Sequence, residues 1–179
     1  MSKVLILAGD FSETLEVFYP YERLREEGYE PVIAAPTKMC FQFVVHDFEG
    51  YDTFTEKLGH GWNADIALAD VNPSDYVALV VPGGRAPEYL RNNEDVKRIV
   101  KHFFGEDSPV AVTCHGPIIL AKAGVLEGRT TSGFPEIAAD IEAGGGTYQN
   151  SEALVDGNLV SSRAWNDNGP WFGKFIALL

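Results

Sequence analysis

Cysteine is scarce in this chain of 179 residues, which holds only Cys40 and Cys114. So few thiols exclude a disulfide framework of the kind that stabilises small secreted proteins. The apolar run Val4–Ala8 near the N-terminus is too short for the core of a secretion signal, and no window of the sequence reaches the length of a membrane span. We therefore expect a cytoplasmic protein, whose thiols stay reduced and available for chemistry.

Basic residues are also few, with 14 Lys and Arg against 26 Asp and Glu and a formal net charge of −12. This balance argues against nucleic acid and against an anionic membrane surface as partners. The first strand-to-helix turn lacks the G-x-G-x-x-G pattern of dinucleotide sites, and no spacing of cysteines and histidines suggests a zinc site. We expect neither a cofactor nor a metal ion.

Apolar segments typical of buried parallel strands alternate with segments of helical periodicity. The expected strands are Lys3–Ala8, Tyr29–Ala35, Asp65–Leu68, Tyr76–Val81 and Ser108–Val112. The expected helices cover about residues 13–27, 87–104, 118–124, 134–141 and 171–179. Two pairs of short strands are expected to flank turns, 41–45 with 51–55 and 153–155 with 159–161. This alternation predicts an α/β fold, with a doubly wound, mostly parallel sheet covered by helices on both faces.

Cys114 stands where an expected strand turns into an expected helix. A strained turn at such a place lifts one side chain clear of the sheet, as in a nucleophile elbow. The positive end of the following helix favours a thiolate, and the adjacent His115 supplies a proton carrier, so we expect a depressed pKa for the thiol. The alternative is a buried structural cysteine, which is a common environment for a free thiol.

Three expected strands end in turns that can meet at one edge of the sheet, where α/β proteins bind their ligands. They are the turn before Glu13, the turn with Gly83 and Gly84, and the turn with Cys114. The two glycine amides, with the amide of His115, could form an oxyanion hole. Glu13 has a second interpretation as a helix cap, since a carboxylate at that position accepts from the first backbone N–H groups.

Several stretches together resemble the DJ-1/PfpI superfamily, and the similarity runs over nearly the whole chain. The matching stretches are Lys3–Leu7, Glu13–Pro20, Val81–Glu88, Cys114–Pro117 and Val155–Arg163. The resemblance implies one domain over residues 1–179 with a flavodoxin-like sandwich of the class I glutamine amidotransferase-like type. It also implies that Cys114 is the nucleophile, that His115 assists it, and that Glu13 hydrogen-bonds the thiol. In the PfpI branch Glu88 of a neighbouring subunit completes the triad, which implies a homo-oligomer.

Residues Val45–His60 resemble the plant-type, cofactor-independent glyoxalases, whereas the PfpI proteases have a shorter connection here. This second resemblance implies a glyoxalase III-type or deglycase enzyme that converts small 2-oxoaldehydes into 2-hydroxy acids without a cofactor. His46 and His60 lie in this stretch and are candidates to line the pocket, although loop histidines often serve only as hydrogen-bonding groups. Two alternatives stay open: a PfpI-like cysteine peptidase using Cys114, His115 and Glu88, and a redox sensor or stress chaperone without turnover.

Overall fold

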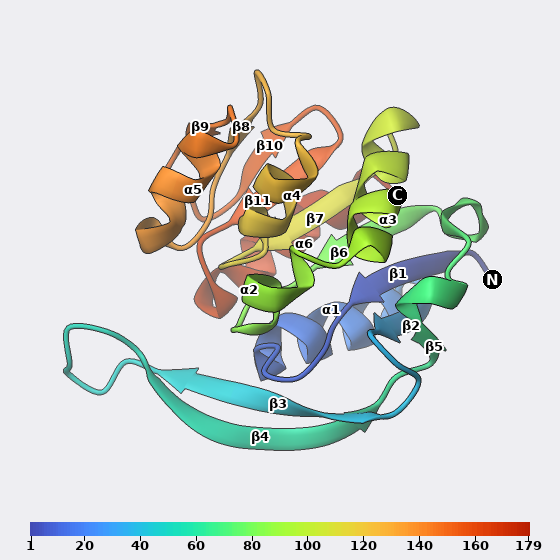
Figure 1. Cartoon of the computed structure of the whole chain (residues 1–179), viewed down its shortest axis with the longest axis horizontal. Coiled ribbons are helices and arrows are strands. Elements are labelled where there is room, and N and C mark those ends of the chain that lie inside the picture. The colour runs from blue at the N-terminus through green and yellow to red at the C-terminus, as the bar shows by residue number, and fades with distance from the viewer.

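A seven-stranded sheet in the order β10-β11-β7-β6-β1-β2-β5 forms the centre of the molecule, and the computed structural model describes all 179 residues (Figure 1). All of its strands run parallel except β10, which pairs antiparallel with β11. The strands are β1 Lys3–Leu7, β2 Glu30–Ala35, β5 Ile66–Ala67, β6 Ala78–Val81, β7 Val110–Thr113, β10 Leu154–Asp156 and β11 Leu159–Ser162. The expected mostly parallel α/β sheet is therefore confirmed.

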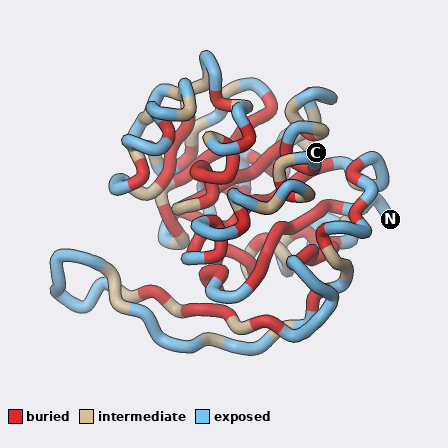
Figure 2. The backbone as a smooth tube through the Cα atoms, viewed as in Figure 1, coloured by how far each residue is buried: buried red, intermediate tan, exposed pale blue.

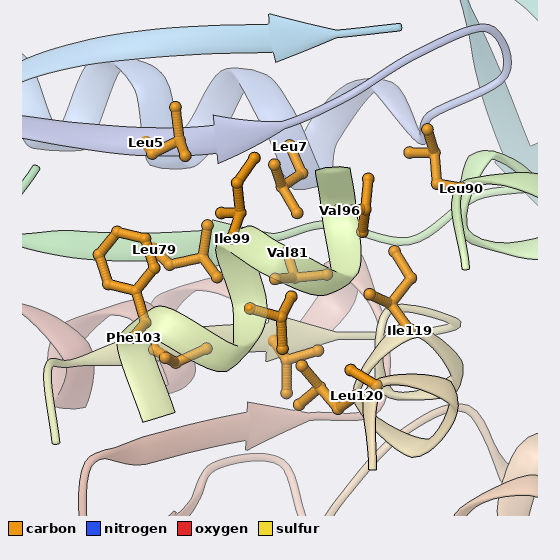
Figure 3. Packing of buried hydrophobic residues seen from close by; sticks show 14 of the residues in the cluster. Leu5, Leu7, Leu79, Val81, Leu90, Val96, Ile99, Phe103, Ile119 and Leu120 are labelled. Carbon is orange, nitrogen blue, oxygen red and sulfur yellow. The ribbon is translucent and has the colours of Figure 1, made fainter. Parts of the chain in front are cut away.

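Helices cover both faces of this sheet because the buried strands are apolar on both sides. Leu5 and Leu7 of β1 point to one face, toward Ile99 of α3 (Glu94–Gly105) (Figure 3). The alternate residues of β1 face the other cluster, which holds the buried aromatic residues of α6 (Asn168–Ile176) and the inner side of α1 (Thr14–Glu26). The first face also carries α2 Ala86–Leu90, α4 Pro117–Ala123 and α5 Ala138–Ala143. None of the helices is both long and apolar enough to cross a membrane.

Several expected boundaries were wrong. The single helix expected over 87–104 is two helices, α2 and α3, because Asn93 breaks it by accepting hydrogen bonds from the N–H groups of Asp95 and Val96. The helix expected at 134–141 begins with a 3-10 turn, Pro135–Ile137, and the closing helix α6 starts and ends earlier than expected. The short strands β8 Thr130–Thr131 and β9 Thr147–Tyr148 and the 3-10 turns Leu68–Asp70 and Trp165–Asp167 were not anticipated. The short turn expected at residues 72–75 is present as the 3-10 turn Pro73–Asp75.

A long hairpin of β3 (Cys40–Asp47) and β4 (Thr55–Asn63) lies outside the central sheet, along the lower side of the molecule in Figure 1. The strand expected at 51–55 was wrong, because residues 51–54 belong to the turn and β4 begins only at Thr55. β3 carries most of the buried residues of the hairpin (Figure 2). The N–H of its Val44 donates to the carbonyl of Ser12. This contact ties the hairpin to the loop that precedes α1.

Candidate active site

Cys114 occupies a strained turn between β7 and α4. Its φ of 55° lies in the left-handed region, which few residues other than glycine adopt without strain. Gly116 completes the turn, and a Cβ at that position would meet the Val81 carbonyl oxygen at 2.5 Å. Cys114 itself is 6% exposed. The local geometry expected of a nucleophile elbow is therefore present, and we call residues 113–116 the elbow.

The carboxyl group beside the thiol belongs to Glu16, which corrects the expectation for Glu13. Glu16 lies next to Cys114 across Gly83, whose N–H donates to Glu16 Oε2 at 2.7 Å. Glu13 is the N-cap of α1, where its Oε2 accepts the Glu16 N–H at 2.9 Å. The cap holds the Glu13 carboxyl at the N-terminal end of α1. Glu16, in the first turn of the same helix, places its carboxyl next to the elbow.

Burial disfavours the charged form of both of these carboxyl groups. Burial raises the pKa of Glu13 to about 7, and it raises the pKa of Glu16 well above the ordinary range. In each residue Oε1 is buried without a hydrogen-bond partner in the chain, which is more costly for a charged carboxylate than for a neutral carboxyl. The site therefore favours a protonated acid next to the sulfur.

The prediction of a depressed thiol pKa was wrong in direction. Burial raises the pKa of Cys114, and the Glu16 carboxyl adds to this effect. The backbone N–H groups of Gly84 and His115 point at the sulfur and lower the pKa, but they do not outweigh burial. The thiol therefore needs a base to take its proton when a substrate arrives.

His115 is placed to be that base. Its Nδ1 lies 3.3 Å from the Cys114 sulfur. Burial lowers the pKa of His115, so the imidazole is neutral and able to accept a proton at neutral pH. The ring is held by Phe134, which stacks on it with centroids 5.3 Å apart.

The expected oxyanion hole changes in one member. The Gly83 N–H already donates to Glu16, whereas the N–H groups of Gly84 and His115 face the sulfur and donate to no carbonyl of the chain. Gly84 has a φ of 78°, and a Cβ there would lie 2.4 Å from the Glu13 nitrogen. The two free donors of Gly84 and His115 are thus the pair that an oxyanion beside the sulfur would meet.

Glu88 lies on α2, half-exposed, with Oε2 at 4.0 Å from Arg85 Nε. Its negative charge raises the pKa of His115 against the effect of burial, so Glu88 acts on His115 within the same chain. That Glu88 also reaches the cysteine of a neighbouring subunit stays a prediction.

The structure separates the two loop histidines. His46 of β3 is buried, its Nε2 lies 3.0 Å from Glu56 Oε1, and its ring packs on Phe54 at 4.5 Å. Phe54 in turn contacts the ring of His115 at 6.1 Å, so His46 belongs to the surroundings of the elbow. His60 is exposed and lies edge-on to Phe18 of α1 at 6.0 Å, outside the ring cluster around His115.

Stability is expected to fall as the pH rises from 4.5, the ordinary pKa of a glutamate, to about 7, the pKa of folded Glu13. Over that window the folded chain binds more protons than the unfolded chain, so raising the pH favours unfolding. Glu13→Gln removes this titration, and urea unfolding at several pH values should show wild type losing stability relative to the variant. A difference that stays constant, or grows in favour of wild type, would contradict a neutral Glu13.

The match to a family model decides the relationship. The DJ-1/PfpI family model matches residues 2–178. The chain belongs to the DJ-1/PfpI family. It is 43% identical over 177 residues to a deglycase of Pyrococcus abyssi, covering 99% of both chains. It is 41% identical over 177 residues to the deglycase PfpI of Pyrococcus furiosus, again covering 99% of both.

A plant member of the family is also similar. The chain is 40% identical over 184 residues to protein DJ-1 homolog D of Arabidopsis thaliana. The match covers 99% of this chain but 47% of the plant protein. Among solved structures, a two-domain protein from Anabaena variabilis with DJ-1/ThiJ/PfpI-like and ferritin-like domains superposes with a TM-score of 0.85 at 28% identity. That match covers 99% of this chain and 48% of the other.

The fold agrees with more distant members. DJ-1beta of Drosophila melanogaster superposes with a TM-score of 0.83 at 21% identity, over 99% of this chain and 91% of that one. The archaeal relatives of the present chain are named deglycases. These names support a family-level function of the deglycase or glyoxalase type, and therefore an enzyme.

Proposed function

We propose that this protein is a cysteine-dependent, cofactor-free enzyme that converts small 2-oxoaldehydes such as methylglyoxal into 2-hydroxy acids. The same site would act on glycation adducts of these aldehydes, as the names of the deglycase relatives suggest. The observation that carries the proposal is a buried thiol in contact with both a buried acid, Glu16, and a neutral base, His115.

The first step is addition of the sulfur to the aldehyde carbon. His115 takes the thiol proton, a bond forms between the Cys114 sulfur and the aldehyde carbon, and the aldehyde oxygen receives a proton from Glu16. The N–H groups of Gly84 and His115 stabilise the charge that develops on this oxygen. The product is a hemithioacetal, with Glu16 as a carboxylate and His115 as an imidazolium.

The second step moves a hydrogen between the two carbons of the adduct. The Glu16 carboxylate removes the proton from the former aldehyde carbon while His115 protonates the ketone oxygen, which gives an enediol. Glu16 then returns its proton to the former ketone carbon, and His115 recovers a proton from the other hydroxyl. Water hydrolyses the resulting thioester, which releases the 2-hydroxy acid and restores the thiol, with the remaining proton passing from His115 to Glu16.

The test is an assay of purified protein with methylglyoxal in the absence of glutathione and of added metal. The expected result is lactate formation that follows enzyme concentration, with no hydrolysis of fluorescent casein in a parallel reaction. Casein hydrolysis without lactate would favour the peptidase alternative. Clean oxidation of Cys114 with neither activity would favour the redox sensor or chaperone alternative.

A further inference from the structure

The surroundings of Cys114 are closed in this structure. Neither Cys114 nor His115 lines any of the five main cavities of the molecule. The ring of His115 is covered by Phe134, which stacks on it, and by Phe54, which lies edge-on to it with centroids 6.1 Å apart. A substrate therefore reaches the sulfur only when one of the segments around the elbow moves.

The turn of the β3–β4 hairpin closes this side of the elbow, and we call residues 48–54 the hairpin tip. The ring of Phe48 lies 6.4 Å from that of Phe134, with an interplanar angle of 21°, and 6.4 Å from that of Trp165. The ring of Phe54 lies 5.6 Å from that of Phe134. These separations are those of aromatic rings in contact, so no passage is left between Phe48 and Phe134.

The base of the hairpin is anchored to the body by hydrogen bonds. The N–H of Phe11 donates to the Gln42 carbonyl at 2.6 Å, and the N–H of Val44 donates to the Ser12 carbonyl at 3.0 Å. The hydroxyl of Thr14 donates to the Val44 carbonyl at 2.9 Å. The lower part of the hairpin is therefore fixed to the start of α1.

The hairpin tip has no such anchor. None of the backbone hydrogen bonds of the chain joins residues 48–54 to another segment. The tip meets the body through the rings of Phe48 and Phe54, and Phe48 is 58% exposed. A segment that lacks backbone hydrogen bonds to the body and makes few buried contacts opens at a low free-energy cost.

The other segments on this side of the elbow are held more firmly. The N–H of Phe134 donates to the Cys114 carbonyl at 2.9 Å, which fixes the loop behind the elbow. The turn that carries Trp165 is held by the guanidinium of Arg163, which donates to both carboxylate oxygens of the buried Asp167 at 2.7 and 2.8 Å. The hairpin tip is therefore the part that can open while the rest of the site keeps its geometry.

We propose that the hairpin tip is a lid that selects the substrates of Cys114 by size, with Phe48 as its specificity-determining residue. The lid opens for a small free 2-oxoaldehyde and closes over it, which keeps water away from the transfer of hydrogen. An aldehyde or adduct carried on a peptide holds the lid open, because the contact between Phe48 and Phe134 leaves no passage for the attached chain. The choice of aldehydes rests on the proposed function, and it narrows the adducts among the substrates to those on small molecules.

The lid can be tested without turnover, by alkylation of the thiol in Cys40→Ser, where Cys114 is the only cysteine. Two neutral reagents are compared, iodoacetamide and a pyrene-linked iodoacetamide, each relative to its rate with glutathione. The pyrene reagent should react more slowly, and adding Phe48→Ala, which removes two aromatic contacts, should narrow the difference by about fivefold or more. Tyr51→Ala is the matched control, since Tyr51 is an exposed aromatic residue of the same tip without a ring contact, and it should keep the difference.

The selection among substrates is tested by kcat/KM for methylglyoxal and for a tripeptide whose C-terminus is a 2-oxoaldehyde. Wild type should prefer methylglyoxal, and Phe48→Ala should reduce this preference by about fivefold or more, whereas Tyr51→Ala should keep it. A melting curve for each variant verifies that it is folded.

The possible failures are distinguishable. Equal relative rates of the two alkylating reagents in Cys40→Ser, or a difference that Phe48→Ala leaves unchanged, would overturn the lid and leave the proposed function standing. Equal kcat/KM for the two aldehydes in wild type would likewise overturn the selection by size. Turnover of neither aldehyde would overturn the proposed function, whereas the alkylation rates would still decide whether the hairpin tip is a lid.

Discussion

Replacing Cys114 by serine is expected to reduce kcat for methylglyoxal by about 10⁴-fold or more, which is the scale seen when other enzymes lose their nucleophile. A hydroxyl is a far weaker acid and nucleophile than a thiol, and the neutral His115 could not take its proton at neutral pH. The variant should stay folded, because serine occupies slightly less volume at a turn set by the backbone. The measurement is the rate of lactate formation, with the melting temperature as the test of folding.

Cys40→Ser is the matched control. Cys40 is the other free thiol, it is exposed, and it stands at the start of β3. Its replacement should leave kcat and KM within about twofold of wild type. Turnover that survives in Cys114→Ser but falls in Cys40→Ser would show that Cys40 is the nucleophile and would contradict our assignment of Cys114.

Replacing Glu16 by glutamine is expected to lower kcat by about 10²–10⁴-fold, the usual contribution of a positioned acid or base. Glutamine preserves the size of the side chain and can still accept the Gly83 N–H, but it cannot carry a proton between the two carbons of the adduct. KM should change little, because the carboxyl acts on the reacting atoms rather than on the remainder of the substrate. Steady-state kinetics would show this as a fall in kcat at a nearly unchanged KM.

Glu13→Gln separates the two carboxyl groups. Glu13 caps α1 one turn before Glu16, so its replacement should cost about 1 kcal/mol of stability and reduce kcat far less than Glu16→Gln does. The two variants therefore compare carboxyl groups that lie one turn apart at the start of the same helix. A loss of activity in Glu13→Gln as large as that in Glu16→Gln would restore Glu13 as the acid of the site.

The fold and the elbow could be predicted because each depends on local sequence. Residues Val4–Leu7 are apolar without interruption, which indicates a strand covered on both faces, and the structure shows helices there. Cys114 lies between an apolar strand and a helix, and this local order predicts a sharp turn at the cysteine, which the structure contains. The resemblance to the DJ-1/PfpI family added what these patterns could not, namely the expectation that Cys114 is a nucleophile rather than a buried structural cysteine.

The identity of the acid could not be read from spacing alone. Glu13 and Glu16 are three residues apart, and both are buried at the start of the same helix. The buried positions Glu16, Pro20 and Leu24 recur every four residues, which is a sequence signal that Glu16 faces inward. The direction of the thiol pKa was missed because burial depends on the packing of the whole site, which no local pattern records.

The contact between the rings of Phe48 and Phe134 depends entirely on tertiary structure. Phe48 belongs to a hairpin turn and Phe134 to a loop on the other side of the elbow, and no periodicity in the sequence joins them. The break at Asn93 has a similar lesson at smaller scale, since a capping side chain overrode the helical periodicity on both sides of it.

The most direct test of the account is to observe the bond between the Cys114 sulfur and the substrate. In Glu16→Gln the imidazolium of His115 can pass the thiol proton to the aldehyde oxygen, so the variant should form the hemithioacetal, although more slowly. It cannot transfer the hydrogen between the two carbons, so methylglyoxal labelled at the aldehyde carbon should give a persistent hemithioacetal signal in carbon NMR of the intact protein. We predict that this signal is present in Glu16→Gln with Cys40→Ser and absent when Cys114→Ser is added to the same two substitutions, so that the exposed thiol of Cys40 contributes to neither spectrum. A signal that survives the loss of Cys114, or wild-type turnover with no adduct in any variant, would contradict covalent catalysis at this cysteine.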